Sequence, residues 1–276
     1  MMNRKAQLSI FLVIALVIVA AVILLSILYT RGLILPLGEE ESKQVLGSQA
    51  EPLRSLVSEC IEAATADALS FASEHGGYAS YQQQGLTSID FAGEKVVVLS
   101  RTDQGFVNRL PSKEEFERQI AAYLNEGAGA GEIDSCLDNF ASFERQGFRI
   151  SPKKRTLSVD VSSESVNVQV DWKIDLGKGR ANLPVDARDV IMLAEAEQAL
   201  RIATDIVNKE ASGIEFEGLE YDKYVASRSL ALRDFEIKSQ NYPSSEQKIF
   251  WITTLPKDPR EKAFTFTFAV DRSVSI

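Results

Sequence analysis

A run of 25 residues without a charged side chain, from Ala6 to Thr30, constrains this chain more than any other feature. Its central part, from Leu8 to Tyr29, consists almost entirely of Leu, Ile, Val, Ala and Phe. About 20 such residues in a helix cross the hydrocarbon core of a bilayer. A helix also satisfies its own backbone hydrogen bonds where no water is present. The sequence therefore predicts a membrane-spanning helix over residues 7–30.

The charges on either side of this run predict its orientation. Arg4 and Lys5 precede it, and the first acidic residue of the chain is Glu39. Basic residues next to a span favour the cytoplasmic side, although Arg31 lies on the opposite flank. We expect a cytoplasmic N-terminus, with the bulk of the chain outside the cytoplasm. The alternative, a cleavable secretory signal, usually has an apolar region of about 7–15 residues and a small-residue cleavage site.

The composition excludes several classes of protein. The chain has 276 residues, of which 45% are hydrophobic, and this is enough for one large core or two small ones. Such a composition is not that of a disordered or collagen-like chain. The formal net charge of -9 argues against a nucleic-acid partner. The expected partner is instead the lipid bilayer.

The segment Arg4-Lys5-Ala6-Gln7-Leu8-Ser9-Ile10-Phe11 resembles the class III signal sequence of archaeal type IV pilin-like proteins. In that family a prepilin-type peptidase cuts after a small residue that follows basic ones, and the apolar helix is kept. The resemblance implies a cut between Ala6 and Gln7, and assembly of copies through the N-terminal helix. Many bacterial members have a glutamate where this chain has Phe11. The alternative is a plain signal anchor, in which Arg4 and Lys5 only set the topology.

The chain after the apolar run divides into a linker and a large domain. Residues 31–51 contain Pro36, Gly38 and an acidic run at 39–41, which is typical of a stalk. Together with a basic leader over residues 1–6 and the span over 7–30, this leaves 52–276 as the domain outside the cytoplasm. A boundary inside that domain, near Ser151, is an open alternative.

Helical patterns dominate the first part of the domain. Pro52 suits a first helical turn, apolar residues recur at helical spacing from there to His75, and Gly76-Gly77 end the pattern. A strand is expected over Val96–Leu99. Further helices are expected at 112–125, where Ser112 and Glu115 form a capping pattern, and at 133–145. Between these two helices the glycines from Gly127 to Gly131 suggest a flexible joint.

The clearest pattern in the chain is the alternation of apolar and polar residues from Ser165 to Leu176. It predicts a strand with one buried face and one solvated face. Leu157, Val159 and Val161 alternate in the same way, and Ser162-Ser163-Glu164 between the two runs predicts a hairpin. Sheets of this one-sided kind are normally antiparallel.

The last part of the chain adds one long helix and three strands. The helix is expected over Asp186–Glu210, and the strands near 224–238, 247–255 and 263–271. The fold class predicted from these elements is α+β, with an antiparallel sheet packed by helices.

Two cysteines, Cys60 and Cys136, occur in the whole chain. If the domain lies outside the cytoplasm, an even count favours a disulfide bond between them. The alternative is a pair of buried free thiols. Their spacing does not suit a zinc site or a redox pair, so we expect no metal and no cofactor.

The sequence offers little sign of catalysis. A triad hydrolase would have to use the single histidine, His75, and no G-x-S-x-G motif accompanies it. The stretch Gly76-Gly77-Tyr78, which follows Cys60, resembles uncharacterised archaeal membrane-anchored proteins and implies no activity. Tyr78 and Tyr81, with the glutamines at 82–84, form a polar-aromatic loop that could contact a partner or a sugar.

The function expected from these features is that of a non-enzymatic, membrane-anchored surface protein, pilin-like at its N-terminus. The alternative is an anchored binding or receptor domain that does not polymerise.

Overall fold

The computed structural model describes residues 18–24, 26, 39–80, 82, 85–101, 107–216, 235–255 and 263–272. None of the helices in these ranges is both long and apolar enough to cross a membrane. Of the predicted span, only 18–24 and 26 are described, and they are helical. The rest of the span, Arg4, Lys5 and the Ala6-Gln7 site lie outside the described residues. So does most of the strand predicted at 224–238.

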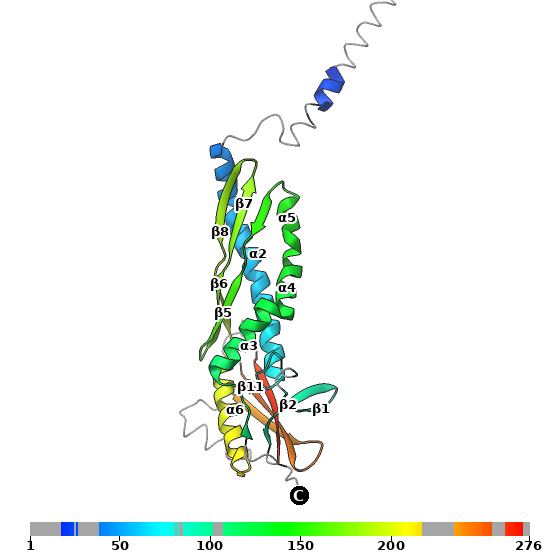
Figure 1. Ribbon diagram of the computed structural model, residues 1–276, viewed down its shortest axis with the longest axis vertical. Coiled ribbons are helices and arrows are strands. Elements are labelled where there is room, and N and C mark those ends of the chain that lie inside the picture. The colour runs from blue at the N-terminus through cyan, green and yellow to red at the C-terminus, as the bar shows by residue number, and fades with distance from the viewer. Residues whose placement is uncertain are drawn as a thin grey trace, which may run out of the picture.

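One long helix, α2 (Glu39–Glu74, 36 residues), runs through much of the elongated body (Figure 1). At 1.5 Å per residue it is about 54 Å long. The sequence predicts a linker up to residue 51 and a helix from Pro52, and this is wrong, because the helix is continuous through Pro52. Leu46 and Ala50, inside the predicted linker, are buried in the same core as later residues of the helix.

Two effects offset the cost of a proline inside this helix, which is about 3 kcal/mol. The first is the burial of Leu46 and Ala50. The second is charge: Glu39 and its two acidic neighbours form the first helical turn, where negative side chains favour the helix dipole. At the other end of the helix the prediction is confirmed, since Gly76 and Gly77 adopt positive φ angles of 65° and 92° directly after it.

A long antiparallel ribbon of three strand tracks, residues 149–193, lies along α2 (Figure 1). Each track is divided into two strands. The tracks are β4 (Arg149–Pro152) with β5 (Thr156–Val161), β6 (Ser165–Asp171) with β7 (Lys173–Lys178), and β8 (Ala181–Asp186) with β9 (Val190–Leu193). The central track pairs with both others, so the order is β4-β7-β8 at one end and β5-β6-β9 at the other.

The division occurs at Trp172, in the middle of the stretch predicted as one strand. The Trp172 indole N–H donates to the carbonyl of Lys153 (2.9 Å), and the Trp172 carbonyl accepts from the N–H of Ala187 (3.0 Å). Both neighbouring tracks shift in register at this level. The predicted burial pattern is nevertheless confirmed: Val166, Val168, Trp172, Ile174 and Leu176 are buried on one face.

Two helices, α3 (Lys113–Glu126) and α4 (Ala128–Leu137), complete this half of the body. The Ser112 hydroxyl accepts from the N–H of Glu115, as the capping pattern predicts. The flexible joint predicted from Gly127 to Gly131 is wrong, because most of these residues form the first turn of α4. A Cβ at Gly129 would lie 2.7 Å from the Tyr123 ring, so this glycine allows the two helices to meet closely.

The helix predicted at 133–145 is interrupted after α4. A 3-10 turn, η1 (Asp138–Phe140), and a short helix, α5 (Ala141–Glu144), follow it. Asp138, Asn139 and Phe140 have positive φ angles, which no regular helix contains.

A second sheet lies at the other end of the body (Figure 1). Its members are β1 (Ser88–Phe91), β2 (Glu94–Arg101), β3 (Val107–Asn108), β10 (Phe235–Asn241), β11 (Gln247–Thr254) and β12 (Thr265–Asp271). The order is β1-β2-β12-β11-β10, with β3 beside β2. All its pairs are antiparallel except β2 with β12, which is parallel.

The helix predicted over Asp186–Glu210 is only partly correct. The structure has strand β9 up to Leu193, and helix α6 (Ala196–Ala211) starts after it. Val190 pairs with Val168 and Met192 with Val166, so strand pairing replaces the first helical turns. Helix α6 and helix α2 both contact the second sheet. The α+β class, with mainly antiparallel sheets packed by helices, is confirmed.

The disulfide bond between Cys60 and Cys136 links α2 to α4 and closes a loop with a sequence separation of 76. Replacing both cysteines with alanine should lower the free energy of unfolding by about 4–5 kcal/mol in the chain-entropy description. Urea unfolding of the two proteins measures this difference. Wild-type protein treated with a reductant is the control and should unfold like the double variant. Equal midpoints with and without reductant would contradict the prediction.

Candidate functional site

The cysteine pair is the one predicted site that the structure describes fully. Cys60 and Cys136 form a disulfide bond with an S–S distance of 2.03 Å and a Cα–Cα distance of 5.7 Å. No described cysteine is free. The bond joins the two helices beside the ribbon, so its place in the molecule is structural.

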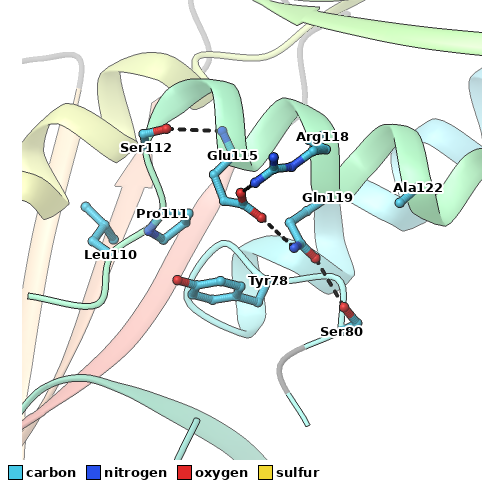
Figure 2. A pocket seen from close by; sticks show the side chains of 9 residues that line it. All are labelled: Tyr78, Ser80, Leu110, Pro111, Ser112, Glu115, Arg118, Gln119 and Ala122. Atoms are coloured by element: carbon cyan, nitrogen blue, oxygen red, sulfur yellow. Dashed lines mark hydrogen bonds and ion pairs between the residues drawn. The ribbon is translucent and has the colours of Figure 1, made fainter. Parts of the chain in front are cut away.

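A cavity of about 640 Å³ opens where helix α3 begins (Figure 2). Three segments contribute to it: the loop after α2, the turn before α3, and the N-terminal turns of α3. Its lining consists of Tyr78, Ser80, Leu110, Pro111, Ser112, Glu115, Arg118, Gln119 and Ala122. It therefore combines one aromatic ring, a proline ring and several groups able to form hydrogen bonds.

A continuous chain of polar side chains forms part of the cavity lining (Figure 2). The hydroxyl of Ser80 donates to Gln119 Oε1 (3.2 Å), and Gln119 Nε2 donates to Glu115 Oε1 (2.7 Å). The second oxygen of Glu115 pairs with the guanidinium of Arg118. Because Gln119 is buried and held at both ends of its amide, its side chain keeps a fixed orientation, whereas the Arg118 side chain is 75% exposed.

Tyr78 presents its ring to the cavity (Figure 2). Its hydroxyl donates to the carbonyl of Arg109 (2.7 Å). Burial raises the pKa of Tyr78, and the nearby charge of Arg109 offsets this only in part, so the phenol is neutral at physiological pH. With its proton engaged, Tyr78 offers a ring surface rather than an acid or a base.

The sequence predicted a contact role for the polar-aromatic loop at Tyr78, but it predicted none for the other residues that line the cavity. Tyr78 lies in the cavity, whereas Tyr81 and the glutamines at 83 and 84 lie outside the described residues. Glu115, Arg118 and Gln119 were not predicted as site residues. Their spacing on α3 places them on one side of the helix, which is also the pattern of an ordinary solvated surface.

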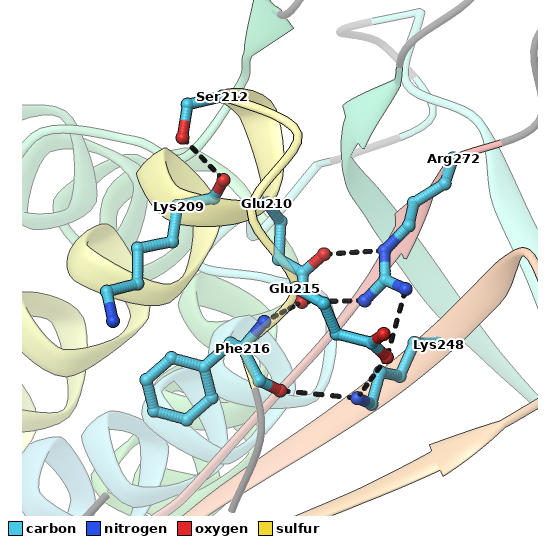
Figure 3. Close-up of polar contacts among 7 residues, drawn as sticks. All are labelled: Lys209, Glu210, Ser212, Glu215, Phe216, Lys248 and Arg272. Atoms are coloured by element: carbon cyan, nitrogen blue, oxygen red, sulfur yellow. Dashed lines mark hydrogen bonds and ion pairs between the residues drawn. The ribbon is translucent and has the colours of Figure 1, made fainter. Parts of the chain in front are cut away.

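A second cluster of polar groups joins the end of α6 to the end of β12 (Figure 3). Arg272 donates two hydrogen bonds to Glu210, of 2.6 and 2.8 Å, and the Glu210 side chain is only 1% exposed. Glu210 also accepts from the backbone N–H of Phe216 (2.9 Å). Arg272 and Lys248 both pair with Glu215, at 3.0 and 3.1 Å.

The charged groups of this cluster form ion pairs with one another, which indicates a structural role rather than a catalytic one. Hydrogen bonds from Arg272 and Lys248, and then their charges, lower the pKa of Glu215. Lys248 is nearly buried and also donates to the carbonyl of Phe216 (3.2 Å). Each charged group faces an opposite charge, as buried ionic groups require.

The single histidine is engaged in packing at the end of α2. His75 Nδ1 lies 2.6 Å from the carbonyl of Phe71, and its ring stacks on the Phe71 ring with centroids 4.2 Å apart. Within the residues that the structure describes, no group of three or more His, Cys, Asp or Glu side chains is placed to hold a metal ion.

Comparison of the chain with protein-family models, with curated proteins and with solved structures gives no match.

The two glutamates of the second cluster should differ in their contribution to stability. Glu210→Gln should lower the free energy of unfolding by about 2–3 kcal/mol, because it leaves a partly buried guanidinium without its closest carboxylate. Glu215→Gln should cost about 0.2–1 kcal/mol, since Glu215 is largely exposed. Urea unfolding at neutral pH measures both values.

The effect of Glu215→Gln should also depend on pH. Because the native pKa of Glu215 is lowered, its contribution is complete above the pKa of the unfolded chain. It is lost as pH falls through the native pKa, so the two proteins should converge in stability at low pH. Glu62→Gln, at an exposed position on α2, is the matched control and should change stability little. A difference between wild type and Glu215→Gln that grows on acidification would contradict the assignment.

Proposed function

We propose that this chain is a membrane-anchored surface protein of the type IV pilin-like kind. In this proposal residues 7–30 cross the bilayer, the N-terminus is cytoplasmic, and the α+β body lies outside. The uncharged run from Ala6 to Thr30 and the preceding Arg4 and Lys5 support this arrangement. The body acts as a structural or interaction module rather than as an enzyme.

The observation that carries the outward orientation of the body is the disulfide bond between Cys60 and Cys136, whereas the pilin-like kind rests on the resemblance at residues 4–11. Such bonds persist in oxidising compartments and are rare in the reducing cytoplasm. A disulfide in the body and basic residues before an apolar run both favour the same orientation. The two arguments are independent, since one rests on redox chemistry and the other on charge.

The form of the body is also consistent with a surface protein. Helix α2 starts shortly after the apolar run and supports the ribbon and the second sheet along its length (Figure 1). The acidic residues of its first turn would be repelled by an anionic membrane surface, which would hold the body away from the lipid. A continuous helix is stiffer than a flexible linker, so it keeps the body away from the lipid more effectively.

The test of the pilin-like proposal is the intact mass and N-terminal sequence of the mature protein from native membranes. A mature chain that starts at Gln7 is the expected result. Ala6→Leu should block the cut, because the resemblance implies a small residue before it. Ala15→Leu, the same change inside the apolar run, is the matched control and should leave the cut intact.

A mature chain that starts at Met1 or Met2 would overturn the pilin-like proposal. The protein would then be a single-pass anchored domain that does not polymerise. A soluble mature protein without residues 7–30 would overturn both and indicate a secretory signal.

We also propose a binding role for the cavity at the start of α3, and its lining favours a small ligand with several hydroxyl groups. The Tyr78 ring can stack on a sugar ring, and Glu115, Arg118 and Gln119 offer donors and acceptors beside it. This role is compatible with anchoring and does not depend on processing at Ala6.

Thermal unfolding in the presence of glucose, galactose or N-acetylglucosamine tests the binding role. One of them should raise the melting temperature, because a ligand at about 100 times its Kd stabilises by about 2.7 kcal/mol. Arg118→Ala should abolish the rise. Arg201→Ala, on the exposed side of α6, is the matched control and should preserve it. No shift with any of the three sugars would contradict the proposal.

A further inference from the structure

Two turns of the chain meet at the end of the body where α2 begins (Figure 1). One is the hairpin turn between β7 and β8, and the other joins α5 to β4. The Arg149 guanidinium donates to the carbonyl of Gly179 (2.9 Å), so it reaches from the second turn to the first. The Lys178 ammonium lies 4.2 Å from the centre of the Phe148 ring, which links the turns in the other direction. The two turns therefore form one surface.

A contact farther along α2 fixes the level of this surface. The Arg54 side chain donates to the carbonyl of Asp186, at the end of β8 (3.2 Å). From Asp186 back to Ala181 the strand covers about 17 Å, and the same length of helix holds about 11 residues. Strand β8 runs back toward the start of α2 (Figure 1). The turn before it therefore lies beside the first turns of that helix.

Four basic side chains gather on these two turns, and we call them the basic tip. Its members are Arg145, Arg149, Lys178 and Arg180. The three arginines are exposed and the lysine is half-buried. None of the four forms an ion pair with a residue that the structure describes. Elsewhere on the ribbon, Lys153 pairs with Asp175 and Arg188 pairs with Glu51. Like charges that lie close together repel one another unless an anion neutralises them, so the basic tip favours an anionic partner.

We propose that the basic tip binds the anionic headgroups of the membrane in which this chain is anchored. The inference rests on the proposed anchoring through residues 7–30. Residue 39, at the start of α2, follows residue 30 by nine positions, and nine residues span at most about 30 Å. The end of the body that carries the basic tip is therefore the end next to the bilayer. Basic side chains at this distance are attracted to anionic lipids.

Acidic side chains at the same end determine how the body meets the lipid. Glu40 and Glu41 are exposed on the first turn of α2, and Glu144 is exposed next to the basic tip. An anionic surface repels these carboxylates and attracts the basic tip. The body therefore leans so that the two turns approach the headgroups while the first turn of α2 stays farther from them.

Fluorescence of the full chain reconstituted in lipid vesicles tests the proposal. Gln146→Cys, exposed in the turn between α5 and β4, supplies one free thiol for an environment-sensitive fluorophore, because Cys60 and Cys136 are bonded to each other. Vesicles of phosphatidylcholine and phosphatidylglycerol in equal parts should shift the emission to the blue relative to phosphatidylcholine alone. Salt at about 1 M should remove this shift, since the screening length is then about 3 Å. Ser244→Cys, exposed between β10 and β11 in the second sheet, is the matched control and should show no shift.

Charge removal separates the basic tip from a general effect of net charge. Arg145→Gln combined with Arg180→Gln should weaken the contact roughly fivefold per lost charge, so that more phosphatidylglycerol is needed for the same shift. Lys154→Gln combined with Arg201→Gln removes the same charge from exposed residues elsewhere on the body. Neither Lys154 nor Arg201 pairs with a described carboxylate, so this double variant is the matched control and should keep the shift.

Equal emission in the two kinds of vesicle would overturn the proposal, and so would an equal loss of the shift in the two double variants. A shift that persists at high salt would overturn it as well. Carbonate extraction of the same vesicles measures the anchoring separately. A chain that carbonate removes is not anchored, which overturns the proposed anchoring together with this inference. A chain that resists extraction and shows no shift overturns only the contact of the basic tip.

Discussion

The buried stripe of helix α2 holds the two sheets and the helices α3 and α4 together in one body. Its apolar residues, from Leu46 to Ala72, belong to one contiguous core that includes both sheets. The helix contacts the ribbon, the helices α3 and α4, and the second sheet. Each sheet needs its apolar side covered, and α2 contributes to the cover of both. The disulfide bond at Cys60 holds α4 on this same helix.

Polar side chains also bond to backbone and side-chain groups at the edge of the ribbon and at the junction between α6 and β12. Asn125 and Glu117 occupy the backbone of β5 and close that edge. Glu210 and Arg272 close the junction between α6 and β12. The cavity beside Tyr78 is where we propose that a ligand binds, since Glu115, Arg118 and Gln119 line it.

Sequence reasoning succeeded where a pattern depends on residues close together in the chain. The alternation through Trp172 predicted the buried face of the ribbon, and Ser112 predicted the start of α3. It failed at 39–51 and at 186–193, where a partner distant in the chain decided the outcome: the core that buries Leu46, and strand β6 beside β9. It also failed at Gly127–Gly131, where the closest contact is the nearby ring of Tyr123 against Gly129.

Patterns along the chain were sufficient to predict the α+β class and the buried face of the ribbon, since both follow from periodicity. The disulfide bond was predicted only on the condition that the domain lies outside the cytoplasm, and two free thiols stayed open as the alternative. The folded arrangement was needed to show that Tyr78 lines one cavity with Glu115 and Gln119, and that Asn125 and Glu117 close the edge at β5. The physical reason is that periodicity is a property of a short segment. Cavities and strand edges depend instead on which segments, far apart in the chain, come to lie side by side.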